Sequence, residues 1–182
     1  MARIPLIDKK EILPPEHRGI YDAIAKSRGQ VHGPFAALLH SPPIAERTAH
    51  LGTYIRFESQ LDRKIVELAT LAAARELECR HEWAAHVTHA AKAGIRQETI
   101  RAIHQRKAPE GLSSEEAQIV NYVQELLRSH RASEPTFQAL LRRLGLRGLV
   151  ELTATIGYYA MLACTLNAFE VVSVNPPEDL KI

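Results

Sequence analysis

The sequence predicts an all-α protein, a single-domain bundle of about seven or eight helices, and three observations lead to this class. Apolar residues recur at helical spacings of three and four along most of the chain, with little competing strand pattern. Serine, glycine and proline residues mark helix starts and stops at short intervals. The hydrophobic fraction of 46% and the charged fraction of 24% are ordinary for a globular domain.

The first part of the chain is divided by proline and glycine. Residues 1–14 are expected to form an extended N-terminal arm, because consecutive prolines disfavour the α conformation for the residue before them. A helix with Pro15 near its first turn should follow, and Gly29 should end it. The helices expected in this half cover residues 16–26, 35–40, 42–57 and 63–78.

The second half has clearer boundary signals. Gly94 is a good residue to follow a helix end, and Ser113 with Glu116 forms a capping-box pattern at a helix start. Gly145 should separate the last two helices. The helices expected here cover residues 81–93, 97–104, 114–129, 134–144 and 147–169, and an irregular C-terminal tail is expected over 170–182.

Length and cysteine content restrict the protein class. A domain holds ~150 residues, so residues 1–182 are expected to form one domain. Two cysteines are too few for a framework of several disulfides, and they are expected to be free thiols in a reducing, cytoplasmic compartment. The first ten residues lack the apolar stretch of a secretory signal, so none is expected there.

Charge and motifs restrict the partners. The 23 Lys and Arg residues against 21 Asp and Glu give a net charge of +2, too small to favour a nucleic acid or an anionic membrane. The sequence has no Gly-rich phosphate loop and no Gly-x-Ser-x-Gly nucleophile elbow. Residues 152–166 carry no charge, but they are shorter than the ~20 residues that span a bilayer, so we expect a buried core helix.

One segment places a thiol, a carboxylate and two imidazoles at helical spacing. Cys79, Glu82 and His86 fall three, four and seven residues apart, so they are expected on one helix face, with His89 near the same stripe. On the preceding helix, Glu67 interrupts an otherwise apolar face. A carboxylate at such a position needs a partner if it is buried.

Less specific interpretations of the same residues stay open. A glutamate and a histidine four residues apart form an ordinary helix-surface pair, and a lone cysteine is most often a small buried hydrophobe. His81 and His86 are five residues apart, so they do not match the zinc-protease motif. A zinc site built from Cys79, Glu82 and His86 on a single helix would be unusual, so no metal is expected.

The sequence resembles the carboxymuconolactone decarboxylase and alkylhydroperoxidase-D-like family. The resemblance extends from residue 35 to about residue 169, and its closing segment over 152–169 is similar to the last helix of the decarboxylase-like branch. The specific part is the spacing Glu67, eleven residues, Cys79-x-x-Glu82-x-x-x-His86. The family implies an all-α fold, assembly of identical subunits as trimers or hexamers, and sites near the subunit contacts.

The family holds two chemistries. Its peroxidase branch uses a Cys-x-x-Cys pair with a downstream histidine and an upstream glutamate as a proton relay. Here position 82 is glutamate, and the only other thiol, Cys164, is far away in sequence. Because a dithiol cycle needs a second thiol to resolve the oxidised one, the dithiol peroxidase is disfavoured. A peroxidase that uses Cys79 with an external thiol remains an alternative.

The decarboxylase branch relies on acid–base groups, and it gives the leading hypothesis. By position, His86 is the general acid or base, with Glu82 and Glu67 as its carboxylate partners and Cys79 as a further catalytic candidate. His81 and Tyr158 are the candidates for binding substrate. The reaction would be a decarboxylase, lyase or isomerase step on a small organic acid or lactone, without a cofactor. A non-catalytic oligomeric protein of the same fold is the third hypothesis.

Overall fold

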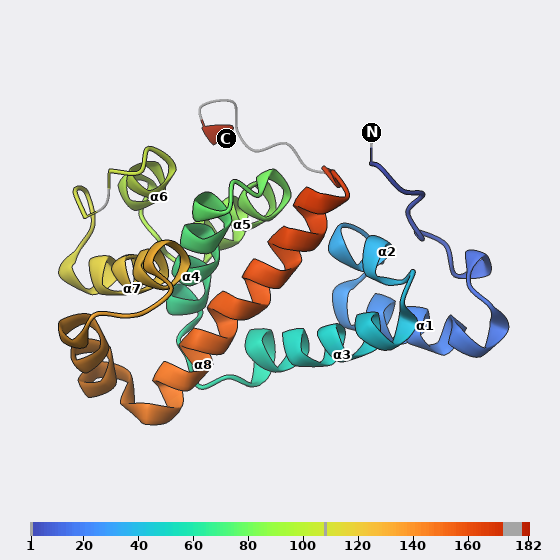
Figure 1. Ribbon diagram of the computed structural model, residues 1–182, viewed down its shortest axis with the longest axis horizontal. Coiled ribbons are helices and arrows are strands. Elements are labelled where there is room, and N and C mark those ends of the chain that lie inside the picture. The colour runs from blue at the N-terminus through green and yellow to red at the C-terminus, as the bar shows by residue number, and fades with distance from the viewer. Residues whose placement is uncertain (1, 108, 173–179) are drawn as a thin grey trace.

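The computed structural model describes residues 2–107, 109–172 and 180–182 of the chain. These residues form eight α-helices and no strand, as the sequence predicts (Figure 1). Two short 3-10 turns, η1 (Lys10–Ile12) and η2 (Pro15–His17), precede the helices. The helices are α1 (Arg18–Arg28), α2 (Pro34–Leu38), α3 (Pro42–Thr53), α4 (Arg63–Glu76), α5 (Arg80–Lys92), α6 (Gln97–His104), α7 (Ser114–Gln124) and α8 (Glu134–Ala168).

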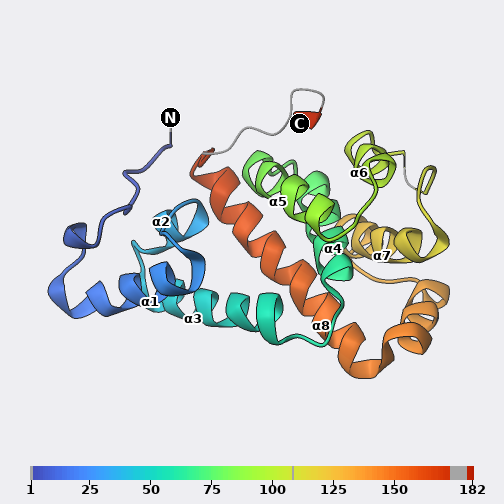
Figure 2. The ribbon, with the colours of Figure 1, turned by 180° about the vertical axis from the view of Figure 1, so that it is seen from behind.

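Helix α8 lies between two groups of helices. Figures 1 and 2 show α1, α2 and α3 on one side of it and α4, α5, α6 and α7 on the other. Helix α4 packs against α5, α7 and α8. Nine consecutive residues of α4, Val66–Ala74, are buried. A helix that is buried on all sides belongs to the core, so α4 is the centre of this half of the molecule.

The observed helix boundaries lie within two residues of the expected ones, once the π-helical turns after α3 and α7 are included. Helices α3 and α7 each continue as a π-helical turn, η3 (Tyr54–Glu58) and η4 (Glu125–Ser129). Helix α1 begins after the 3-10 turn η2 and runs to Arg28. Because element ends are fixed by local hydrogen bonding, periodicity alone places them only to within a few residues.

Gly145 separates two helical segments within α8. Its φ of 69° and ψ of 172° lie outside the helical region, and the residues on both sides are helical. Glycine accepts a positive φ without the strain that a Cβ atom would cause. The sequence prediction of two helices that meet at Gly145 therefore agrees with the backbone.

The N-terminal arm runs back along the bundle to the end of α8. The backbone amide of Arg3 donates to the carbonyl of Phe169 over 2.9 Å, and the amide of Ile7 donates to the carbonyl of Ala36 over 2.9 Å. The arm is mostly extended, as expected, with the single turn η1 in it. It thus holds α2 against the C-terminal end of α8.

The C-terminal segment is only partly described. The indole of Trp83 donates to the carbonyl of Leu180 over 2.6 Å, and Leu180 is buried. The end of the chain is therefore anchored on α5. Residues 173–179, over which most of the irregular tail was expected, lie outside the described residues.

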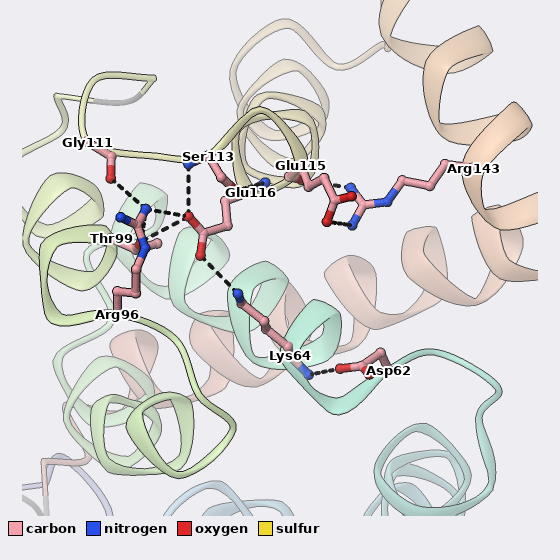
Figure 3. Close-up of polar contacts among 9 residues, drawn as sticks. All are labelled: Asp62, Lys64, Arg96, Thr99, Gly111, Ser113, Glu115, Glu116 and Arg143. Carbon is pink, nitrogen blue, oxygen red and sulfur yellow. Dashed lines mark hydrogen bonds and ion pairs between the residues drawn. The ribbon is translucent and has the colours of Figure 1, made fainter.

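A polar network around Glu116 joins three helices (Figure 3). Its carboxylate accepts hydrogen bonds from Thr99, Arg96 and the backbone amide of Ser113, each over 3.0 Å, and Lys64 lies 3.2 Å away. Burial favours the neutral acid, but these bonds outweigh burial and lower the pKa of Glu116 to about 2. The predicted capping box at Ser113 is present, and the network fixes α4, α6 and α7 relative to one another.

Helix α8 is long and apolar enough to cross a membrane by length and composition. Its most apolar window, however, is 56% buried inside the protein. That burial is the pattern of a core helix, so the length of α8 is weak evidence for a membrane span.

Candidate functional site

A pocket of about 240 Å³ opens between α5, α8 and the segment that contains α1, α2 and η3. Glu82 and His86 of α5 lie at its floor, because both are buried and both line it. The volume is below the ~300–1,000 Å³ of drug-sized ligand pockets, so it suits a small metabolite. The other lining residues are Arg28, His32, Pro34, Phe35, Arg56, His81, Ala85, His89, Tyr158, Tyr159 and Leu162.

The imidazole of His86 lies between two carboxylates. Its Nδ1 atom is 2.7 Å from Oε2 of Glu67 on α4, and its Nε2 atom is 3.4 Å from Oε2 of Glu82 on α5. The four-residue spacing of Glu82 and His86 places them one turn apart on the same helix face. The structure therefore brings together three of the four predicted catalytic residues.

Glu67 supports His86 from behind the pocket. Its side chain is completely buried, and its other carboxylate oxygen forms an ion pair with Arg63, one turn earlier on α4. The carboxylate that interrupts the apolar face of α4 thus has two partners of opposite charge. A buried charge requires such pairing, because removal from water costs several kcal/mol.

The charges in this cluster shift the pKa of His86 and that of Glu67 in opposite directions. Burial lowers the pKa of His86, but hydrogen bonds to Glu67 and Glu82 outweigh burial and raise it to about 9. Burial raises the pKa of Glu67, but the hydrogen bond with His86 and the positive charges of His86 and Arg63 together outweigh burial, and the net pKa is lowered. At neutral pH His86 is therefore an imidazolium beside an ionised Glu67.

Two tyrosines of α8 form the apolar wall of the pocket. The ring of Tyr159 meets the His86 ring edge-on, with centroids 5.0 Å apart, and Tyr158 meets Tyr159 in the same way at 5.2 Å. Burial raises the pKa of both phenols, so both are neutral hydrogen-bonding groups at physiological pH. Tyr158, a predicted substrate-binding residue, does line the pocket.

His81 and His89 lie on either side of the floor. Burial lowers the pKa of His81 and, together with the charge of His86, lowers the pKa of His89. Both are therefore neutral near pH 7 and differ from His86. His81 packs so closely on Gly33 that a Cβ atom at Gly33 would lie 2.6 Å from the His81 ring. His81 lines the pocket, and its role in substrate binding stays a prediction.

Cys79 lies outside the pocket. Cys79 is the N-cap of α5, with extended backbone angles, and precedes the helix that carries Glu82 and His86. It does not line the pocket that these two residues line. Its side chain is fully buried among Ala37, Ala163 and Leu166. Burial raises the pKa of Cys79 to about 12, so the thiol is protonated at neutral pH. Cys79 and the exposed Cys164 are both free.

Sequence reasoning missed two arginines of the pocket, Arg28 from α1 and Arg56 from η3. Neither lies in a motif, and the sequence carries no local signal that would have found them. Arg80, the neighbour of His81 in the sequence, is exposed and does not line this pocket. In the described ranges no group of three or more His, Cys, Asp or Glu side chains is arranged to hold a metal ion.

The sequence profile of the Carboxymuconolactone decarboxylase family matches residues 42–125. These residues include the Glu67, Glu82 and His86 cluster. The matched segment belongs to the carboxymuconolactone decarboxylase family. The resemblance inferred from the spacing of the cluster is thereby confirmed for this part of the chain, whereas Arg28, Tyr158 and Tyr159 lie outside it. None of the curated proteins matches the chain significantly in sequence.

Solved structures share the fold of this chain. A peroxidase-related alkylhydroperoxidase AhpD core protein from Ralstonia eutropha JMP134 has a TM-score of 0.75 and 15% identity, covering 98% of this chain and 94% of its own. A peroxidase-related protein from Silicibacter sp. TM1040 has a TM-score of 0.70 and 16% identity, covering 97% and 94%. The debrominase Bmp8, in complex with 2,3,4-tribromopyrrole, has a TM-score of 0.72 and 11% identity, covering 92% and 90%. At these identities the likeness shows the alkylhydroperoxidase-D-like fold alone.

Proposed function

We propose that the protein is a cofactor-free acid–base enzyme that acts on a small organic acid or lactone. The observation that carries the proposal is the position of His86 between the buried Glu67 and the pocket-lining Glu82. An imidazole held between two carboxylates can take part in both acid and base steps in one site. The pocket volume supports a small substrate.

The reaction is one that passes through an enolate. In a decarboxylation the C–C bond breaks, carbon dioxide leaves, and the electron pair of that bond moves onto a neighbouring carbonyl to form the enolate. The imidazolium of His86 stabilises this negative charge, and a proton held between His86 and Glu82 is delivered to carbon. In the reverse direction Glu82 takes the same proton from the product, so the product should exchange its C–H hydrogen with solvent.

Exchange with deuterium oxide tests this step before the natural substrate is known. Wild-type protein is incubated with a panel of lactones and keto acids, and loss of the proton next to the carbonyl is followed by NMR. His86→Ala should reduce the exchange rate at least a hundredfold, because general acid–base groups contribute ~10²–10⁴-fold. His50→Ala, which removes an exposed histidine outside this pocket, is the matched control. Undiminished exchange in His86→Ala would show that the proposed role is wrong.

A thiol-dependent peroxidase that uses Cys79 is the second candidate, favoured by the peroxidase-related proteins among the fold relatives. The buried position of Cys79 and its pKa of about 12 oppose it, because the nucleophile in such a reaction is the thiolate. The rate of hydroperoxide consumption in the presence of dithiothreitol measures the peroxidase activity directly. A rate that falls in Cys79→Ser would favour the peroxidase over the acid–base enzyme.

The third candidate is a non-catalytic oligomeric protein, in which the Glu82 and His86 pair would be structural. The cavity beside this pair counts against it, because a purely structural pair needs no pocket.

We also propose self-association in the cytoplasm, as a trimer or hexamer. Exposed apolar side chains on one helix support an interface: Leu146, Val150 and Met161 of α8. Val150→Asp should lower the mass measured by sedimentation if α8 forms the subunit contact.

A further inference from the structure

We propose that Arg28 and Arg56 form a carboxylate-binding subsite in the pocket, facing the group that contains Glu82 and His86. The inference deepens the proposed function, on which it rests for the identity of the pocket as the active site. It assigns the substrate to the small carboxylates. Arg28 lies outside the segment that the family profile matches, whereas Arg56 lies within it.

Arg28 is held in place by its surroundings. Its Nη1 atom donates to the hydroxyl of Ser27 over 2.6 Å, and its Nη2 atom donates to the carbonyl of Ala49 over 3.1 Å. Its guanidinium carbon lies 4.2 Å from the centre of the Phe35 ring, and it also hydrogen-bonds Tyr158. A guanidinium fixed in this way loses little conformational freedom when it binds a ligand.

Arg56 is half-buried, and its guanidinium is incompletely hydrogen-bonded. Its Nε atom is buried and has no hydrogen-bond partner in the described part of the chain. A buried donor without a partner costs ~1–3 kcal/mol. Arg56 also affects the pKa values of His89, Tyr158 and Tyr159, so its charge lies near the centre of the pocket. Arg56 lines the pocket, so its positive charge can act on an anionic ligand there.

The charges around the pocket leave these two cations unmatched. Among the described residues, neither Arg28 nor Arg56 forms an ion pair with a carboxylate. Glu82 is the one carboxylate that lines the pocket, and its partner is His86. Glu67 also pairs with Arg63, so Glu67 and Glu82 balance only His86 and Arg63. The positive charges of Arg28 and Arg56 are therefore left for an anionic ligand.

The small volume of the pocket and the presence of Glu82 favour a carboxylate over a phosphate. A carboxylate carries one negative charge and a planar pair of oxygens, which the planar fork of an arginine matches in two parallel hydrogen bonds. A phosphate near its second ionisation carries up to two charges and would lie close to Glu82. The small volume, about 240 Å³, further favours a compact planar acid.

Gly52 provides a way to disturb the subsite without a change of charge. A Cβ atom at Gly52 would collide with the Tyr158 hydroxyl and would lie 2.8 Å from Nη2 of Arg28. Because α3 is helical at this point, alanine there suits the backbone and strains only these side chains. Gly52→Ala should therefore displace Arg28 and Tyr158 together and weaken carboxylate binding.

Calorimetry with benzoate and benzamide tests the proposal on the full-length protein at pH 7.5. The two probes have the same shape and differ in charge. Benzoate should bind with at least tenfold higher affinity than benzamide, and Arg28→Gln and Arg56→Gln should each weaken benzoate at least tenfold. Arg47→Gln is the matched control, because Arg47 is exposed and bonds only the carbonyl of Pro43 in its own helix. Phosphate should bind more weakly than benzoate.

Three results would overturn the subsite: equal binding of benzoate and benzamide, no binding of benzoate, or arginine variants that bind as wild type. Phosphate binding tighter than benzoate would replace the carboxylate class by a phosphate class. Binding is measured without turnover, so it is independent of the His86 chemistry. Carboxylate binding without proton exchange would contradict the proposed function alone. Exchange in a carboxylate substrate that is unaffected by both Arg28→Gln and Arg56→Gln would contradict the subsite alone.

Discussion

The Nδ1 atom of His86 lies 2.7 Å from Oε2 of Glu67, and this contact joins the pocket-lining face of α5 to the buried face of α4. Because Glu67 has no access to solvent and is also paired with Arg63, it holds the imidazole ring in one orientation. The charge on His86 therefore depends on a residue that lines no part of the pocket.

Glu67→Gln should lower the pKa of His86, because it replaces the buried negative charge by a neutral amide of the same shape. His86 titrates near pH 9 in the wild-type protein, and we expect a fall of at least one pKa unit, measured by NMR of the histidine ring. The same change should cost roughly 2 kcal/mol of unfolding free energy, because Arg63 loses its buried partner. A His86 pKa unchanged in Glu67→Gln would contradict the assignment.

Stability should fall as pH rises from about 7 to 10. A histidine whose folded-state pKa is raised from 6.5 to about 9 contributes stability that is fully present below the unfolded value and is lost as pH rises through the folded one. Urea unfolding at pH 7 and pH 10 should show this loss, and His86→Ala should remove most of it. If His86→Ala loses as much unfolding free energy between pH 7 and pH 10 as the wild-type protein, groups other than His86 cause the loss.

Glu116→Gln should destabilise the protein without affecting the pocket. Because the pKa of Glu116 is lowered to about 2, its contribution is present above pH ~4.5 and is lost as pH falls toward 2. We expect a loss of roughly 2 kcal/mol at pH 7, measured by urea unfolding. Glu115→Gln is the control, since Glu115 is exposed and pairs only with Arg143 across the surface (Figure 3). Equal losses in the two variants would contradict the role of the network.

One thiol of the native protein should react with an alkylating reagent. Cys164 is exposed, whereas Cys79 is buried and its pKa is raised to about 12. Mass spectrometry after brief treatment with iodoacetamide should find the label on Cys164, and treatment in urea should label both. Rapid labelling of Cys79 in the native protein would contradict its burial and would favour the peroxidase hypothesis.

The sequence was sufficient to predict the fold and the central cluster, because both depend on local periodicity. Glu82 and His86 lie one turn apart on one helix, and the carboxylate within the apolar α4 needed a buried partner. Cys79 was grouped with this cluster, but it precedes the helix, which begins at Arg80, and a helix start depends on φ and ψ at a single residue. Periodicity constrains that position poorly.

The arginines of the pocket could not be predicted in this way. Arg28 and Arg56 come from α1 and η3, and they reach the pocket through the packing of the N-terminal segment on the side of α8 opposite α4 (Figure 1). Such contacts join residues far apart in the sequence, and no spacing rule relates them to His86. The chemistry of the pocket floor is therefore encoded locally, whereas the charge that would select a substrate depends on tertiary structure.

The most direct measurement compares wild-type protein with Glu82→Gln in deuterium exchange. Glutamine keeps the shape of Glu82 but cannot accept a proton from carbon. Proton transfer through Glu82 and His86 predicts that exchange at the carbon next to the carbonyl falls at least a hundredfold in Glu82→Gln, with benzoate binding still detectable. Exchange at the wild-type rate in Glu82→Gln would contradict the proposed function.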